Sequence, residues 1–113
     1  MRQYLLALFL LLFFLIPSSA QETPKREFRG AWIQTVYQPQ YAEMDSAAMR
    51  GYFDAMLDTL QRSGINALLF QIRPESDAFY ESNIEPWSRF LTGKQGRSPE
   101  RGWDPMAYLI GKC

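Results

Sequence analysis

The stretch from Asn66 to Trp103, NALLFQIRPESDAFYESNIEPWSRFLTGKQGRSPERGW, decides the fold. It opens with a short apolar segment that ends at QIRP (71–74), and a long polar and aromatic loop follows. Parallel α/β proteins build their sites from a buried strand with polar groups at its carboxyl end, followed by an elaborate loop. We therefore expect the functional residues of this chain to lie within residues 66–103.

Two strands and one helix are predicted around this stretch. Residues 28–36 (FRGAWIQTV) and 65–73 are predicted strands, and ALLF (67–70) lacks the polar alternation of a strand with one face in water. Between them, Met49, Phe53, Met56 and Leu60 recur at helical spacing, so residues 46–63 are predicted to form a helix with Gly64 as its C-cap. Residues 37–44 are predicted to be a loop. Strand, helix and strand make a βαβ unit.

A second helix is expected to begin at Asp104 and Pro105, with an apolar face of Met106, Leu109 and Ile110. The sequence stops about two turns into this helix. Two strands cannot cover both faces of a parallel sheet, so residues 28–113 are predicted to be the first part of a larger α/β domain. We expect the end at Cys113 to reflect an early stop, a frameshift or an incomplete sequence.

The first 20 residues are predicted to be a signal peptide. Arg2 precedes an apolar run over residues 5–16, Pro17 ends it, and Ser18 and Ala20 are small residues of the kind that a signal peptidase reads. The run is shorter than the roughly 20 residues that a spanning helix needs, although an uncleaved membrane anchor is an alternative. We expect cleavage after Ala20, export to the periplasm or the medium of a bacterium, and no stable membrane span afterwards. Residues 21–27 are predicted to be a linker.

The composition excludes several classes of function. Lys and Arg together number 12, and so do Asp and Glu. The chain therefore lacks the excess of basic residues that is typical of nucleic-acid-binding proteins. The chain has no histidine, which rules out Ser-His-Asp and Cys-His nucleophile systems within it. The one cysteine, Cys113, cannot form an internal disulfide. No cofactor and no metal site is predicted.

Several spaced motifs resemble one known family. They are FRGAW (28–32), GINA (64–67), FQIRP (70–74), DAFY (77–80), EPWS (85–88), LTG (91–93) and DP (104–105). In this order they resemble the start of the glycosyl-hydrolase-like 10 family, formerly domain of unknown function 187. The resemblance implies a (β/α)8 TIM barrel, exported in bacteria, that acts as a glycoside hydrolase. Residues 28–113 would then be its N-terminal quarter, truncated: two strands, the helix between them, the long loop and the start of the next helix.

The resemblance also bears on the chemistry. Glycoside hydrolysis uses two carboxyl groups across the scissile bond. In barrel glycosidases these usually follow later strands, so we expect the catalytic pair beyond Cys113. Glu75 and Asp77 are the nearest approach to a carboxyl pair here, and acidic residues at such positions also cap turns. Asp77 is predicted to hydrogen-bond substrate.

Gln71 and Arg73 share strand parity, so both are predicted to point toward the barrel mouth and contact substrate. A guanidinium there can bind sugar hydroxyls or a carboxylated sugar. The alternative for Arg73 is a structural ion pair with Glu75, Asp77 or an acid on a later strand.

Aromatic side chains are the remaining candidates, because their faces stack on the apolar faces of sugar rings. Trp32, Tyr37, Tyr80 and Trp87 are available, and aromatic residues also pack in cores. Trp32 is predicted to pack, whereas Tyr80 and Trp87 are predicted to bind a polysaccharide or oligosaccharide. Three hypotheses remain open: a glycoside hydrolase, possessing its carboxyl pair on later strands; a non-catalytic carbohydrate-binding barrel; and a truncated product without function.

Overall fold

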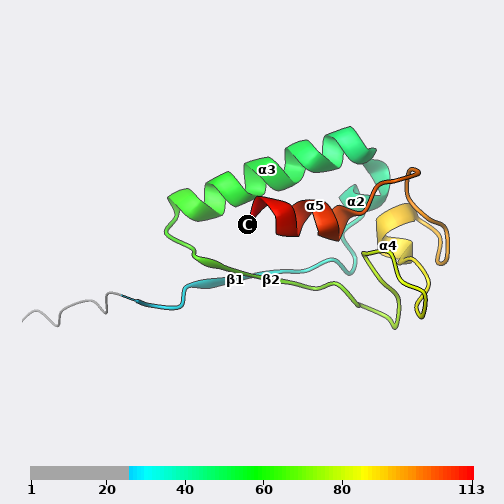
Figure 1. Ribbon diagram of the computed structural model, residues 1–113, viewed down its shortest axis with the longest axis horizontal. Helices are drawn as coiled ribbons and strands as arrows, with labels where there is room; N and C mark the ends of the chain where they lie inside the picture. The colour runs from blue at the N-terminus through cyan, green and yellow to red at the C-terminus, as the bar shows by residue number, and fades with distance from the viewer. Residues whose placement is uncertain (1–25) are drawn as a thin grey trace, which may run out of the picture.

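The computed structural model describes residues 26–113, which form a mixed α/β structure (Figure 1). Along the chain the elements are β1 (Gly30–Ile33), α2 (Gln40–Glu43), α3 (Ser46–Arg62), β2 (Ala67–Phe70), α4 (Arg89–Thr92) and α5 (Pro105–Lys112). The predicted signal peptide and residues 21–25 of the predicted linker lie outside the described residues. None of the helices within residues 26–113 has the length and apolar character needed to cross a bilayer.

The two strands form a parallel sheet, as predicted. Gly30 pairs with Ala67 at one end of the ladder and Ile33 with Phe70 at the other. Helix α3 connects them, so the chain makes the expected βαβ unit. Figure 1 shows α3 and α5 together on one side of the two strands.

Both strands are shorter than predicted, because side chains replace the backbone partners at each end of the ladder. At the N-terminal end, the Oδ1 atom of Asn66 accepts a hydrogen bond of 2.8 Å from the backbone N–H of Arg29. At the C-terminal end, the backbone N–H of Gln71 still donates to Ile33, but the next donor, Thr35 N–H, bonds to the Gln71 side chain at 3.0 Å. Four residues therefore remain in each regular strand.

Helix α3 agrees with its prediction. The Oδ1 atom of Asp45 accepts a hydrogen bond of 2.8 Å from the backbone N–H of Ala48, which caps the helix. Gly64 has a φ of 79°, the left-handed conformation expected after a helix C-terminus. The prediction that residues 37–44 are only a loop was wrong, because they contain the single turn α2. Its Tyr41 is almost fully buried, so this turn is fixed by tertiary packing rather than by a sequence pattern.

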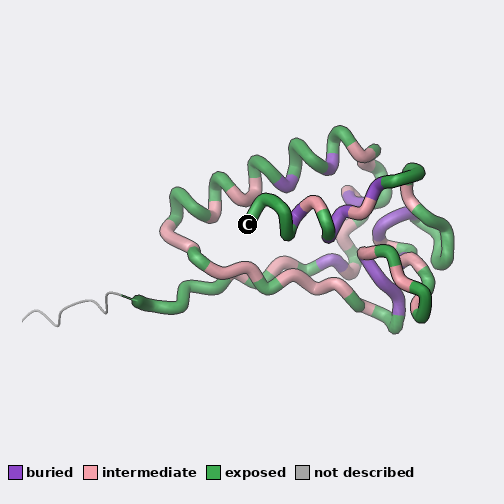
Figure 2. Tube along the Cα trace, in the orientation of Figure 1, coloured by how far each residue is buried: buried purple, intermediate pink, exposed green. Residues whose placement is uncertain are grey.

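An aromatic cluster holds the elements together. Tyr41 of α2, Phe53 of α3, Phe70 of β2 and Phe79 of the following loop pack at ring-centroid distances of 5.7 to 6.4 Å. Figure 2 shows the buried segments gathered where α2, α4 and the long loop meet α3 and α5. Burial, and after it the neighbouring Tyr52, raises the pKa of the Tyr41 hydroxyl above its ordinary value, because an anionic phenolate would be poorly solvated within this cluster.

Helix α5 begins where it was predicted. The Oδ1 atom of Asp104 accepts hydrogen bonds from the backbone N–H groups of Met106 and Ala107, at 2.9 and 3.0 Å, and Pro105 occupies the first turn. The other carboxylate oxygen of Asp104 accepts from the backbone N–H of Glu81 at 3.0 Å. One side chain thus caps the helix and also fastens the long loop to it.

The sheet face opposite the helices is uncovered within residues 26–113. Leu69 is 42% exposed, so the prediction of burial on both faces does not hold in this part of the protein. Its register partner Trp32 is 61% exposed, and the prediction that Trp32 packs was wrong here. Both side chains point away from α3, as the alternating burial of β1 indicates. With Phe28 they form an apolar surface around Gly30.

Phe53→Ala is expected to destabilise the fold by about 3–5 kcal/mol, because it removes a fully buried ring from the centre of the aromatic cluster. Urea denaturation followed by circular dichroism measures this. Ile110→Ala is the matched control, since Ile110 is 69% exposed on α5 and its loss is expected to change stability by less than about 0.5 kcal/mol. Equal losses in the two variants would contradict the aromatic cluster as the core.

Candidate functional site

The carboxyl ends of the two parallel strands lie at the same edge of the sheet, and the loops that follow them meet there. Six residues define what we call the strand-end site: Thr35, Tyr37, Gln71, Arg73, Asp77 and Glu85. Thr35 and Tyr37 follow β1, and the other four follow β2. In parallel α/β folds this edge is where binding and catalytic residues gather.

Gln71 ties the two strand ends together. Its Oε1 atom accepts hydrogen bonds from the backbone N–H groups of Thr35 and Val36, at 3.0 and 3.3 Å. The hydroxyl of Thr35, which is fully buried, donates to the backbone carbonyl of Gln71 at 2.8 Å. Gln71 was predicted to contact substrate, and the structure places its side-chain oxygen in this link between the loops.

Arg73 forms an ion pair with Glu85 across the long loop. The Arg73 side chain is 57% exposed, whereas that of Glu85 is only 12% exposed. The sequence suggested Glu75, Asp77 or an acid on a later strand as the structural partner of Arg73, whereas the partner found within residues 26–113 is Glu85 of the long loop. Arg73 therefore has one side held by a carboxylate and another open to solvent.

Asp77 is fully buried. Its Oδ1 atom accepts a hydrogen bond of 3.3 Å from the backbone N–H of Glu75, which shapes the turn after Pro74. The Oδ2 atom is buried without a hydrogen-bond partner among the described residues, and so is Oε2 of Glu85. Unpartnered buried carboxylate oxygens are costly, so each can gain from a donor supplied by substrate or by another part of the protein.

Glu75 is held by a second ion pair, with Arg89 of α4 at 2.9 Å. Both side chains are partly exposed, so the pair contributes little to stability. Of the carboxylates that follow β2, Glu75 and Glu85 are thus ion-pair partners and Asp77 is a buried turn residue.

The long loop folds back on itself beside β2. The backbone N–H of Ala78 donates to the carbonyl of Pro86 at 2.9 Å, and Ser88 N–H donates to the carbonyl of Ala78 at 2.8 Å. Tyr80 and Trp87, predicted to stack on sugar, are each half-buried and pack against the hydrophobic core. Their remaining surface is open, and their role in binding stays a prediction.

Backbone strain is concentrated at the strand-end edge. Among the described residues, two non-glycine residues have a positive φ: Tyr37 at 54° and Ser76 at 55°. Tyr37 follows β1 and Ser76 follows β2, so both loops carry one such residue. Left-handed residues of this kind persist where surrounding contacts over-determine them, and they cluster at functional sites.

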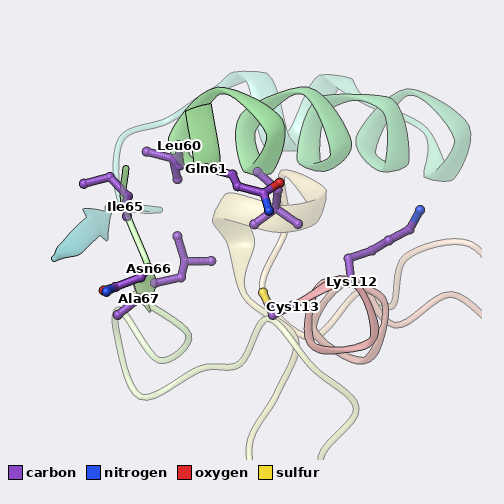
Figure 3. Close-up of a pocket in the computed structure, with 9 residues that line it drawn as sticks. Leu60, Gln61, Ile65, Asn66, Ala67, Lys112 and Cys113 are labelled. Carbon is purple, nitrogen blue, oxygen red and sulfur yellow. The ribbon is translucent and has the colours of Figure 1, made fainter. Parts of the chain in front are cut away.

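A hollow of about 260 Å³ lies at the other end of the sheet (Figure 3). It is lined by the end of α3, the residues leading into β2 and the last two residues of the chain, among them Leu60, Ile65 and Lys112. The predicted site residues follow the carboxyl end of β2, whereas this hollow adjoins its amino end. It is therefore separate from the strand-end site.

No three His, Cys, Asp or Glu side chains within residues 26–113 come close enough together to hold a metal ion. The strand-end site offers guanidinium, amide, hydroxyl and aromatic groups instead. Such groups bind neutral or anionic hydroxylated ligands through hydrogen bonds and stacking.

The sequence pattern of the glycosyl hydrolase-like 10 family matches residues 27–113. This chain belongs to that family. The resemblance drawn from the spaced motifs is therefore confirmed. The matched region contains β1, β2 and every residue of the strand-end site.

Two curated proteins show the similarity at the level of sequence. Glycosyl hydrolase YngK of Bacillus subtilis (strain 168) is 38% identical over 98 residues, which cover 84% of this chain and 19% of that protein. Glycosyl hydrolase DigH of Escherichia coli (strain K12) is 34% identical over 107 residues, which cover 86% of this chain and 24% of that protein. The chain spans about a fifth to a quarter of the length of these relatives.

Sequence reasoning missed Thr35, and it did not identify Glu85 as the partner of Arg73. Thr35 could have been found from strand register, because it lies two residues beyond Ile33, whose partner Phe70 directly precedes Gln71. No local signal identifies Glu85, since it meets Arg73 only because the loop folds back through Ala78 and Pro86.

Gln71→Leu is expected to lower stability by about 1–3 kcal/mol, because it leaves the N–H of the buried Thr35 and that of Val36 without their acceptor. Urea denaturation measures the loss. Gln34→Ala is the matched control, since it removes an exposed glutamine of the same segment whose side-chain hydrogen bond, to the carbonyl of Val36, is open to solvent, and it should cost less than about 0.5 kcal/mol. A Gln71→Leu variant as stable as Gln34→Ala would show that the link between the strand ends is unimportant.

Proposed function

We propose that this protein contributes one side of the substrate cleft of a glycoside hydrolase that acts on a polysaccharide, for which cell-wall glycan is one candidate. In this proposal β1, α3, β2 and α5 begin a (β/α)8 barrel. Membership of the glycosyl hydrolase-like 10 family supports it, and so does the parallel βαβ unit, which is the repeating unit of such barrels.

One observation carries the proposal: the loops after both strands bring polar and aromatic groups to the carboxyl edge of the sheet. Gln71 fixes the loops relative to each other through its hydrogen bond to Thr35. Arg73 has a half-exposed side chain whose guanidinium forms an ion pair with Glu85. A guanidinium restrained in this way loses little conformational freedom when it binds sugar hydroxyls or a carboxylate. Asp77 is fully buried within residues 26–113, and its contact with substrate stays a prediction.

The acid–base chemistry is assigned to other residues of the barrel. Hydrolysis needs a proton donor and a second carboxylate on opposite sides of the scissile bond. Near β2, Glu75 and Glu85 are each bound to an arginine, and Asp77 supports a turn. These three carboxylates therefore suit substrate positioning better than proton transfer, and the catalytic pair is expected on later strands.

A carbohydrate-binding function without hydrolysis is the second candidate. The state of the carboxylates near β2 favours it: Glu75 and Glu85 are paired with arginines, and Asp77 is buried. Release of reducing ends from a glycan distinguishes the two functions, since a binding protein retains the glycan intact.

Arg73→Lys is expected to weaken binding of a soluble oligosaccharide about tenfold, because lysine keeps the charge beside Glu85 but lacks the planar fork of donors. Isothermal titration with chitohexaose and cellohexaose measures the affinity. The melting temperature should change by no more than about 2 °C, since lysine keeps a positive charge beside the Glu85 carboxylate.

Arg73→Ala is the informative companion variant. It leaves the Glu85 carboxylate, which is mostly buried, without its partner, so it should lower stability as well as binding. Adding Glu85→Gln should restore the melting temperature but not the affinity. If Arg73→Lys binds as tightly as the wild type, Arg73 is structural; if neither oligosaccharide nor a cell-wall glycan binds the wild type, the proposed function is wrong.

We also propose that the protein is exported and processed. N-terminal sequencing of the protein recovered from outside the cytoplasm is expected to begin at Gln21, because Ser18 and Ala20 satisfy the requirement for small residues before the cleavage site. Replacing Ala20 with Trp should block processing and leave Met1 in place. An unprocessed wild-type protein in the membrane fraction would favour the membrane-anchor alternative instead.

A further inference from the structure

Tyr37 is the one aromatic residue among the six that define the strand-end site. It is 77% exposed, whereas Tyr80 and Trp87, the aromatic residues predicted to bind sugar, are half-buried against the core. Trp32 is also exposed, but it lies within β1 on the open sheet face rather than at the strand end. Of these four aromatic residues, Tyr37 combines open surface with a position at the edge where the loops meet.

The backbone of Tyr37 adopts an unfavourable conformation. Its φ of 54° lies in the left-handed region, which glycine and asparagine tolerate and which a bulky side chain disfavours. A glycine at this position would avoid the strain. The presence of a large aromatic residue at a strained and exposed position needs a reason other than folding.

The segments on both sides of Tyr37 hold it in place. On one side, Thr35 and Val36 are hydrogen-bonded to Gln71. On the other side, α2 begins at Gln40, and its Tyr41 is anchored in the aromatic cluster. The chain between these two anchors has little freedom, so the left-handed conformation is imposed from outside.

The ring of Tyr37 is also oriented. It meets the ring of Phe90 in α4 at a centroid distance of 5.6 Å and an interplanar angle of 70°, an edge-on arrangement. The guanidinium of Arg89 lies over the same Phe90 ring, 4.8 Å from its centroid, and pairs with Glu75. The ring is thus braced by one edge contact while most of the side chain remains exposed.

We propose that Tyr37 is a substrate-binding residue whose aromatic face stacks on a sugar ring at the mouth of the strand-end site. This inference rests on the proposed function, because it assigns a contact within the same carbohydrate cleft. Gln71 acts as the positioning residue for this platform through its hydrogen bonds to Thr35 and Val36. The anchors on both sides of Tyr37 impose the strained backbone and so keep the ring at the edge of the site.

The test compares three variants of the processed protein, residues 21–113, by isothermal titration with chitohexaose and cellohexaose. Tyr37→Asn and Tyr37→Gly remove the ring and accept the left-handed conformation, so the dissociation constant should rise about three- to tenfold without a fall in melting temperature. Tyr37→Phe keeps the ring and should bind within about twofold of the wild type. In the wild type, the ring resonances of Tyr37 should shift during an NMR titration.

The matched control is Ile84→Ala, which removes an apolar side chain that is 93% exposed in the neighbouring loop and should not change affinity. Unchanged binding by Tyr37→Asn, with binding weakened by Arg73→Lys, would overturn this inference and leave the proposed function standing. Equal losses in Tyr37→Phe and Tyr37→Asn would also overturn it, because the hydroxyl would then be the binding group. A wild type that binds no glycan would overturn both.

Discussion

The hydrogen bonds between the side chain of Gln71 and the backbone of Thr35 and Val36 govern the geometry of this structure. They end the parallel ladder early and fix the point at which each loop leaves the sheet. At the opposite end, Asn66 forms the corresponding bonds: its Oδ1 atom accepts from Arg29 and its amide donates to the carbonyl of Glu27. Two amide side chains thus bound a ladder of four residue pairs.

The aromatic cluster makes this short sheet sufficient. Phe70 carries the end of β2 into contact with Phe53 of α3 and with Phe79 of the long loop, so strand, helix and loop share one apolar centre. The buried surface accordingly lies near the carboxyl ends of the strands, where the loops gather. A rigid base beneath exposed polar groups is the arrangement that binding sites require, because ordering the site then costs little when a ligand arrives.

The sequence allowed prediction of those features that local patterns determine. Residues such as Asp45 and Asp104 cap helices through bonds to their own first turns, so the starts of α3 and α5 were predictable. The spaced motifs likewise identified the family. Contacts between distant residues were not predictable: Arg73 reaches Glu85 only because the loop reverses, and Tyr37 is strained only because Gln71 and Tyr41 hold its neighbours.

The uncovered sheet face has a consequence for how these residues behave apart from a covering partner. Within residues 26–113, each strand has one edge without a neighbouring strand, and Trp32 and Leu69 expose apolar surface beside those edges. Open edges next to apolar side chains act as templates for adding further strands, whether from the same chain or from another copy. Where nothing covers this face, self-association into extended sheets competes with the folded state. The soluble fraction of the protein then falls as its concentration rises, and chaperones that bind the exposed face raise it.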